Sequence, residues 1–153
     1  MIKRRKILIL AALTAALVGC KTTPVRTTPE HFSTYEETQK SISAEGVVYR
    51  QKQLELDQGD IDFWKAALKI RMVEDAGYQF VSEEDLVVDG TPGYLIELQA
   101  PIGIEDYRYL IAIFKTDKHL TLIESAGKIE DFLSRRDAII EAVKGLGFSG
   151  SSK

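Results

Sequence analysis

Four segments with the composition of β-strands follow one another between residues 78 and 126, separated only by short polar stretches. They are YQFVSEEDLVV (78–88), YLIELQA (94–100), YRYLIAIF (107–114) and LTLIESA (120–126). The charged SEED stretch inside the first segment indicates a bulge or a loop. Parallel strands need crossover connections of a dozen or more residues, which these short stretches cannot supply. The pattern therefore predicts an antiparallel meander and argues against a parallel nucleotide-binding sheet.

Amphipathic helices are predicted before and after this series of strands. The first helix begins after Asp60, a good N-cap, and ends at Gly77, a typical C′ residue. The last helix runs from about residue 131 to 146. Its apolar stripe consists of Phe132, Ile139, Val143 and Leu146. An extended segment at 47–56 precedes the first helix, so the predicted fold class is α+β, with an antiparallel meander sheet packed with two main helices.

The turn DGTPG (89–93) lies between the first two strands of the meander. Glycine tolerates positive φ without steric cost, and tight hairpin turns require positive φ. Gly90 and Gly93 are therefore both expected to serve the turn. Pro92 is interpreted in the same way, as a residue selected for backbone geometry.

The N-terminus combines a basic stretch, MIKRRK, with twelve mostly apolar residues at 7–18. Twelve residues are too few to cross about 30 Å of hydrocarbon as a helix, and they suit the core of a signal peptide. The sequence Leu17-Val18-Gly19-Cys20 follows and contains the only cysteine of the chain. An uncleaved membrane helix and an ordinary secretory signal are the alternatives.

Leu17-Val18-Gly19-Cys20 resembles the lipobox of bacterial lipoproteins. The resemblance implies that residues 1–19 are removed and that Cys20 carries a diacylglycerol and an acyl chain such as palmitate. Two or three chains make a durable anchor, whereas one chain binds membranes reversibly. Lys21, in place of an aspartate, implies sorting to the outer membrane. The expected location is the cell envelope, anchored by lipid in the outer membrane and facing the periplasm.

Residues 20–45 are predicted to be the lipidated cysteine and a flexible tether, because Thr-Thr-Pro occurs at 22–24 and again at 27–29. Such polar, proline-containing segments bury too little apolar surface to offset the entropy lost on ordering. The globular domain is expected at 46–147, and residues 148–153 are expected to be a disordered tail.

The globular part resembles the Mog1/PsbP-like domains, including the DcrB-type bacterial lipoproteins. The matching features are Gly77-Tyr78, Gly90-x-Pro92-Gly93, the tyrosine-rich strand that follows, and Phe132 at the start of the last helix. The resemblance covers about residues 46–147 and implies the same α+β fold. Partner-binding and assembly factors predominate in that family, and it supplies no catalytic residues to carry over.

The composition of the chain does not favour catalysis or nucleic-acid binding. Without residues 1–19, the chain keeps 16 basic and 23 acidic residues, a net charge of −7. Nonspecific nucleic-acid binding depends on cations that neutralise phosphates, so no nucleic-acid partner is expected. The cysteine is assigned to the anchor, His31 lies in the tether, His119 lies at a turn, and no G-x-S-x-G motif is present. No enzymatic activity, cofactor or metal site is predicted.

Several polar groups have an ordinary structural interpretation and a less favoured functional one. Asp57, Asp60 and Asp62 are interpreted as helix capping rather than a calcium loop, because the ligand spacing of such a loop is missing. The carboxylates of Glu83, Glu84 and Asp85 are interpreted as a solvated loop, and a weak cation site is the alternative. The basic residues Lys128, Arg135 and Arg136 are interpreted as an exposed helix face. Glu124 either lies at an exposed edge or points inward with Arg108 as its partner.

Trp64, Tyr94, Tyr107 and Tyr109 are the candidate residues of a ligand groove, and core packing is the alternative. The favoured function is that of a noncatalytic envelope lipoprotein, held to the membrane by its N-terminal lipid, that binds or helps to assemble an envelope protein partner. A module that binds a small ligand or a cation is the second hypothesis.

Overall fold

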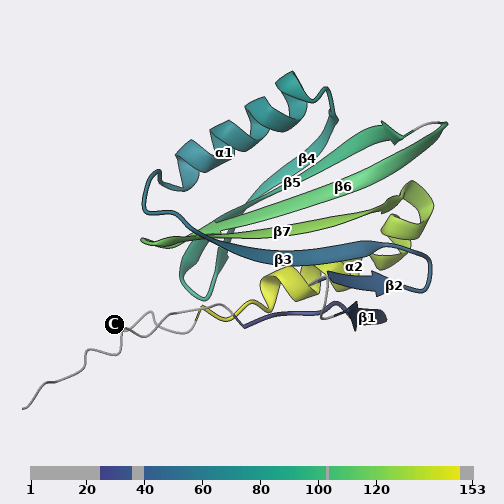
Figure 1. Ribbon diagram of the computed structural model, residues 1–153, viewed down its shortest axis with the longest axis horizontal. Coiled ribbons are helices and arrows are strands. Elements are labelled where there is room, and N and C mark those ends of the chain that lie inside the picture. The colour runs from purple at the N-terminus through teal and green to yellow at the C-terminus, as the bar shows by residue number, and fades with distance from the viewer. Residues whose placement is uncertain (1–24, 36–39, 103, 149–153) are drawn as a thin grey trace, which may run out of the picture.

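The computed structural model describes residues 25–35, 40–102 and 104–148, which form one antiparallel sheet with helices on both of its faces (Figure 1). The strands are β1 Phe32–Tyr35, β2 Lys40–Ser43, β3 Val48–Glu55, β4 Gln79–Val88, β5 Thr91–Ile102, β6 Glu105–Lys115 and β7 His119–Lys128. The helices are α1 Ile61–Lys69, its π-helical continuation η2 Ile70–Asp75, and α2 Ile129–Lys144. The predicted α+β fold class is confirmed.

The strands are ordered β1-β2-β3-β7-β6-β5-β4, and all six neighbouring pairs are antiparallel. Strands β4 to β7 form the predicted meander, because each one pairs with the next along the chain. The segment before α1, β3, returns to pair with β7, the last strand of the meander. Helix α1 and η2 therefore connect a strand inside the sheet to β4 at its edge.

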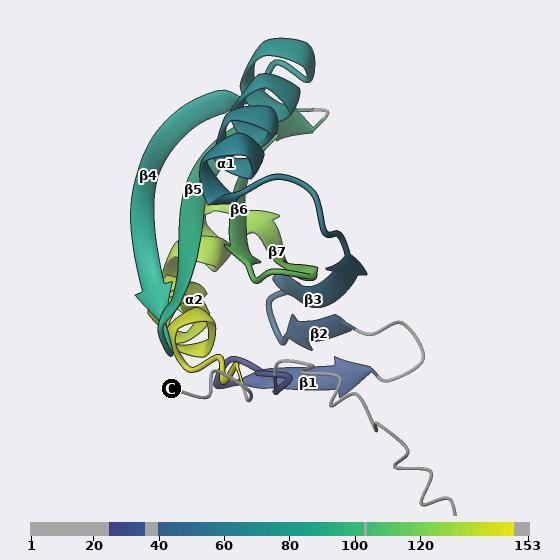
Figure 2. The ribbon, with the colours of Figure 1, turned by 90° about the vertical axis from the view of Figure 1, so that its left-hand side faces the viewer.

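Helices α1 and α2 lie on opposite faces of the sheet (Figure 2), and the alternation of side chains along the strands divides the core between these faces. On β6, Leu110, Ala112 and Phe114 belong to the apolar cluster that includes Phe132, Ile139 and Val143 of α2. The residues between them, Ile111 and Ile113, belong to the cluster beneath α1. Because a β-strand points successive side chains to opposite faces, one central strand supports both helices.

The β4–β5 hairpin turns at Asp89 and Gly90, whose φ angles are 48° and 73°. Two residues with positive φ suit the twist of flanking strands, which confirms the expectation for Gly90. The expectation for Gly93 was wrong, because this residue pairs with Phe114 inside the sheet and has no positive φ. A Cβ on Gly93 would lie 2.4 Å from Cδ1 of Phe114, so the glycine makes room for that ring.

Helix α1 begins as expected, with the Phe63 amide donating to Oδ1 of Asp60 at 2.8 Å. Gly77 follows η2 with a φ of 71°, so the helix also ends at the expected residue. Strand β4 contains the predicted interruption as a register shift between Phe80 and Ser82. The strand continues through SEED on the other side of this bulge.

The flexible tether expected over residues 20–45 requires a correction within the described part of the chain. Strands β1 and β2 extend the sheet beyond β3, and the Val25 amide donates to the carbonyl of Gly147 at 3.1 Å. The Thr27 amide donates to Oε1 of Gln51 at 3.1 Å, and its hydroxyl lies 2.8 Å from that of Tyr49. This segment buries little apolar surface. Hydrogen bonds to β3 and the pairing of β2 with β3 hold it in place instead. The domain therefore begins at Val25 or earlier.

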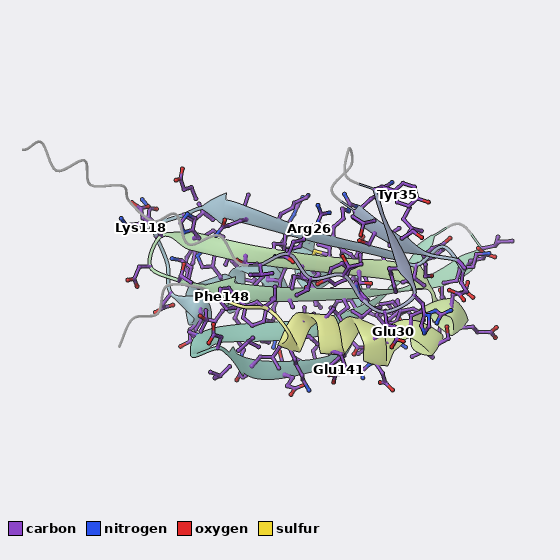
Figure 3. All side chains as sticks on the ribbon, turned by 90° about the horizontal axis from the view of Figure 1, so that it is seen from below. Arg26, Glu30, Tyr35, Lys118, Glu141 and Phe148 are labelled. Atoms are coloured by element: carbon purple, nitrogen blue, oxygen red, sulfur yellow. The ribbon has the colours of Figure 1, made fainter. Side chains whose placement is uncertain are left out.

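The tail expected at 148–153 also needs correction at its first residue. Phe148 is only 7% exposed, and its ring centroid lies 5.3 Å from that of Phe114. Its amide donates to Oδ2 of Asp89 at 3.0 Å. Figure 3 shows Phe148 just beyond the C-terminal end of α2, where it packs against the core.

The predicted signal peptide, including Leu17, Val18 and Gly19, and the predicted lipidation residue Cys20 lie outside the described residues. Within the described ranges, no helix is long and apolar enough to cross a membrane.

Candidate functional site

Three of the four aromatic residues predicted for a ligand groove meet in one apolar cluster beneath α1. Tyr94 is fully buried there, and Trp64 and Tyr109 are partly buried against the same cluster. Tyr107 is half-buried further along β6 and is not part of that cluster. The three residues are therefore packed as core, which favours the structural interpretation over the groove.

The hydroxyl of Tyr94 joins a polar network that attaches α1 to β4. It donates to the carboxylate of Glu83, which also pairs with Lys69 of α1 at 2.9 Å. Next to this pair, Nζ of Lys65 lies 2.6 Å from Oδ1 of Asp85. Burial, followed by the hydrogen bond to Glu83, raises the pKa of Tyr94. Glu83 and Asp85 are therefore strand residues that hold a helix, and the predicted solvated loop was wrong.

Glu124 occupies a similar position on β7. It accepts a hydrogen bond from the hydroxyl of Tyr109 and lies 3.6 Å from Nζ of Lys52. The predicted partner, Arg108, cannot reach it, because Arg108 precedes Tyr109 on β6 and points to the opposite face. Burial and the hydrogen bond to Glu124 raise the pKa of Tyr109.

Ion pairs neutralise the predicted basic spot at the start of α2. Lys128 pairs with Glu105 at 2.8 Å, Arg135 pairs with Glu45, and Arg136 pairs with Glu97. The interpretation as a simple exposed helix face therefore needs correction for Arg136, because the side chain of Glu97 is only 4% exposed.

A hollow of about 620 Å³ lies where the loop after β3 enters α1, at the N-terminal end of the helix in Figure 1. We call it the α1 hollow, and its lining residues are Leu56, Asp57, Gln58, Gly59, Asp60, Phe63 and Trp64. Phe63 is 57% exposed although it lies on an amphipathic helix. Of the predicted groove residues, only Trp64 lines the α1 hollow.

Gly59 determines the shape of the α1 hollow. Its φ is 73°, and a Cβ there would lie 2.5 Å from Cδ1 of Phe63 and 2.8 Å from Nε1 of Trp64. The indole Nε1–H of Trp64 donates to the carbonyl of Gln58 at 3.0 Å. The rings of Phe63 and Trp64 are nearly perpendicular, with centroids 5.2 Å apart. A hydrogen bond therefore joins Trp64 to the loop, and an edge-to-face contact joins the two rings.

Two aspartates, Asp57 and Asp60, are among the residues that line the α1 hollow. Asp60 caps the helix, and Asp62 lies in the first turn, where negative charge is favourable. Asp57 lies ahead of the helix and makes no ion pair among the residues that the structure describes. Within those residues, no group of three acidic, histidine or cysteine side chains is placed to hold a metal ion.

Sequence reasoning missed Leu56, Gly59 and Phe63 as parts of a site. The signal was present in DQGDIDFW (57–64), where a turn glycine directly precedes two aromatic residues. The exposure of the Phe63 ring depends on how α1 lies on the sheet. Hydrophobic periodicity does not specify that arrangement.

No family model matches the chain, and no curated protein matches its sequence. Solved structures do resemble it in fold. LpqN of Mycobacterium tuberculosis, described as involved in cell envelope biogenesis, aligns with a TM-score of 0.61 at 9% identity, over 84% of this chain and 86% of that one. The Pseudomonas aeruginosa protein PA94 aligns with a TM-score of 0.58 at 13% identity, over 78% of this chain and 97% of that one.

The cyanobacterial PsbP protein of Synechocystis, CyanoP, is also similar. Its TM-score is 0.52 at 10% identity, over 71% of this chain and 72% of that one. At such identities the likeness shows the fold alone. The described residues therefore share the α+β fold of this PsbP protein, which is the fold that the sequence resemblance implied.

Proposed function

We propose that this chain is a lipid-anchored cell-envelope protein that binds a protein partner and catalyses no reaction itself. The observation that supports binding is the α1 hollow, where the side chain of Phe63 is 57% exposed beside a loop of fixed shape. Exposed aromatic side chains at the edge of a concave surface are typical of interaction sites. The lipobox resemblance of residues 17–20 supports the anchor, and Lys21 in place of an aspartate supports the location in the outer membrane, facing the periplasm.

The described part of the domain begins only a few residues after Cys20, which limits how far the domain could lie from the proposed lipid. Val25, which is bonded to Gly147, follows Cys20 by five residues. Five extended residues span at most about 18 Å. A lipid on Cys20 would therefore hold the domain close to the bilayer surface, and the partner would be a membrane-bound or membrane-proximal protein.

Among the structural neighbours, the description of LpqN as involved in cell envelope biogenesis agrees with an envelope role for this chain. That agreement is support by analogy, because function is carried by sites and not by folds.

A small-ligand or cation-binding module is the second candidate function. The α1 hollow, at about 620 Å³, falls within the size range of small-molecule sites. A saturable increase in thermal stability with calcium or with a lipid would favour this candidate over a protein partner.

Two experiments test the proposal. Replacing Cys20 with alanine should abolish incorporation of labelled fatty acid, and continued incorporation would refute the lipid anchor. Proximity labelling from the mature domain in its native host should repeatedly enrich the same envelope protein. The control is an unrelated envelope lipoprotein that carries the same label. Enrichment no greater than in this control would count against a protein partner.

A further inference from the structure

We infer that the α1 hollow receives a lysine or arginine side chain carried on an apolar surface of the protein partner. The inference deepens the proposed function and rests on it, because it assigns the partner's chemistry at the contact. Its elements are a concave site, two aspartates among the lining residues, and the exposed ring of Phe63 next to the partly buried Trp64.

The negative charge at the α1 hollow exceeds what the helix requires. Asp60 caps α1, and Asp62 lies in its positively polarised first turn, so both have a structural reason. Asp57 precedes the cap by three residues and has no ion-pair or hydrogen-bond partner among the described residues. It lines the α1 hollow with its charge unbalanced, which favours a cation as the group that enters.

The aromatic side of the α1 hollow suits the same group. A lysine or arginine cation is attracted to the face of Phe or Trp, more strongly when water is excluded. The same domain uses this interaction internally, since Nζ of Lys65 lies 4.9 Å from the ring centroid of Tyr94. The Nε1–H of Trp64 is already donated to the carbonyl of Gln58, so this donor is not available to a ligand.

The exposed apolar surface around the α1 hollow favours a protein-borne cation over a free one. Phe63 lines the hollow and is 57% exposed, and Leu54, which lies on β3 two residues before the lining residue Leu56, is 43% exposed. A small free cation would leave both side chains in water. A basic side chain that projects from an apolar surface would fill the hollow and cover them at once.

The only tryptophan of the chain lies in the α1 hollow, so intrinsic fluorescence reports directly on this site. We would titrate the mature chain from residue 20, with Cys20→Ser to prevent lipidation, with the blocked peptide Ac-Leu-Lys-Leu-NH2. Peptides with norleucine or glutamate in place of lysine are the matched controls, and tetramethylammonium chloride is the free cation. We expect a saturable change with the lysine peptide, weakened by salt, and at least tenfold weaker binding of the other probes.

Two variants test the residues that carry the inference. Asp57→Asn removes only the charge, and Phe63→Leu removes the ring but keeps an apolar side chain. Each variant should bind the lysine peptide about three- to tenfold more weakly. Glu74→Gln, an equally exposed acidic residue in η2 at the far end of the helix, should leave binding unchanged. Asp57→Asn should also reduce the salt dependence, a change that a purely structural role would not produce.

Equal binding of the norleucine peptide, or no change with any peptide, would overturn the inference. Tetramethylammonium binding as tightly as the lysine peptide would assign the site to free organic cations and overturn it as well. Proximity labelling separates this failure from failure of the proposed function. A partner recovered equally with the wild type and with the Asp57→Asn, Phe63→Leu double variant overturns only the inference, whereas no partner with the wild type overturns the proposed function.

Discussion

Replacing Arg136 with methionine would leave one carboxylate buried without its partner. Arg136 donates from Nε to Oε1 of Glu97 at 2.7 Å and also pairs with it through Nη2. The side chain of Glu97 is 4% exposed, whereas that of Arg136 is 38% exposed. Methionine keeps most of the apolar stem of arginine and removes the charge, so the variant isolates the electrostatic loss.

The expected loss of stability in the Arg136→Met variant depends on how little water reaches Glu97. Removing one partner of a fully buried pair costs about 3–5 kcal/mol, because the remaining charge is uncompensated. Since Arg136 is partly exposed, water screens the pair to some extent, and we expect a loss of about 2–3 kcal/mol. For a domain of this size, such a loss lowers the melting temperature by about 6–12 °C.

Arg135→Met is the matched control, because Arg135, the neighbour of Arg136 on α2, pairs with Glu45, whose side chain is 31% exposed. Water can solvate Glu45 once the arginine is gone, so the loss should be clearly smaller. The free energy of unfolding would be measured by urea denaturation of the lipid-free mature chain with each substitution. Adding Glu97→Gln to Arg136→Met should restore part of the lost stability, because the buried charge is then removed.

Two results would refute this reasoning. An Arg136→Met variant that loses no more stability than Arg135→Met would show that burial of the partner carboxylate does not control the cost. A double variant no more stable than Arg136→Met would show that the loss comes from packing and not from an unpaired charge.

Three further predictions concern other residues of the core. Burial raises the pKa of Tyr49 to about 12 and, with hydrogen bonds to carboxylates, also raises those of Tyr94 and Tyr109. Because the pKa of an unfolded tyrosine is about 10, the stability from these three residues is present below pH ~10 and lost as pH rises through their folded pKa values. The chain has 6 tyrosines, so the ionisation of Tyr49, Tyr94 and Tyr109 would be followed residue by residue by NMR and should accompany unfolding. Ionisation of these three residues near pH ~10 in a folded domain would contradict this. Gly93→Ala should destabilise the domain by about 1–3 kcal/mol in urea denaturation, because its Cβ would meet Phe114 and the carbonyl of Ile113, and Phe114→Leu should recover part of the loss. Phe148→Ala should cost about 2–4 kcal/mol in the same assay, whereas no loss would support the disordered tail.

Features that depend on neighbouring residues were predictable from the sequence. Asp60 caps α1, Asp89-Gly90 turns the hairpin, and the segments from 79 to 128 pair as an antiparallel meander. Each depends on local chemistry: a side chain that accepts from an amide three residues later, a glycine that tolerates positive φ, and connections too short for a crossover.

The limits of the globular domain were not predictable in the same way. Residues 32–35 and 40–43 carry few apolar side chains, so composition assigned them to a tether. Strand β2 pairs with β3, and β1 pairs with β2. The preceding Thr27 is also held by β3, because its partner atoms lie 22 and 24 residues further along the chain. Likewise, Phe148 is held by Asp89 and Phe114, to which no periodicity connects it.

The sequence by itself determined the class of the fold, the positions of its turns and caps, and the lipobox resemblance on which the proposed location rests. Only the tertiary structure decided that Arg136 compensates a buried Glu97, that Tyr94 is core, and that Phe63 and Trp64 border a hollow with Asp57. The reason is physical. Turns and caps are satisfied within a few residues, whereas pairing of charges and exposure of an aromatic ring depend on how a helix lies against strands distant in sequence.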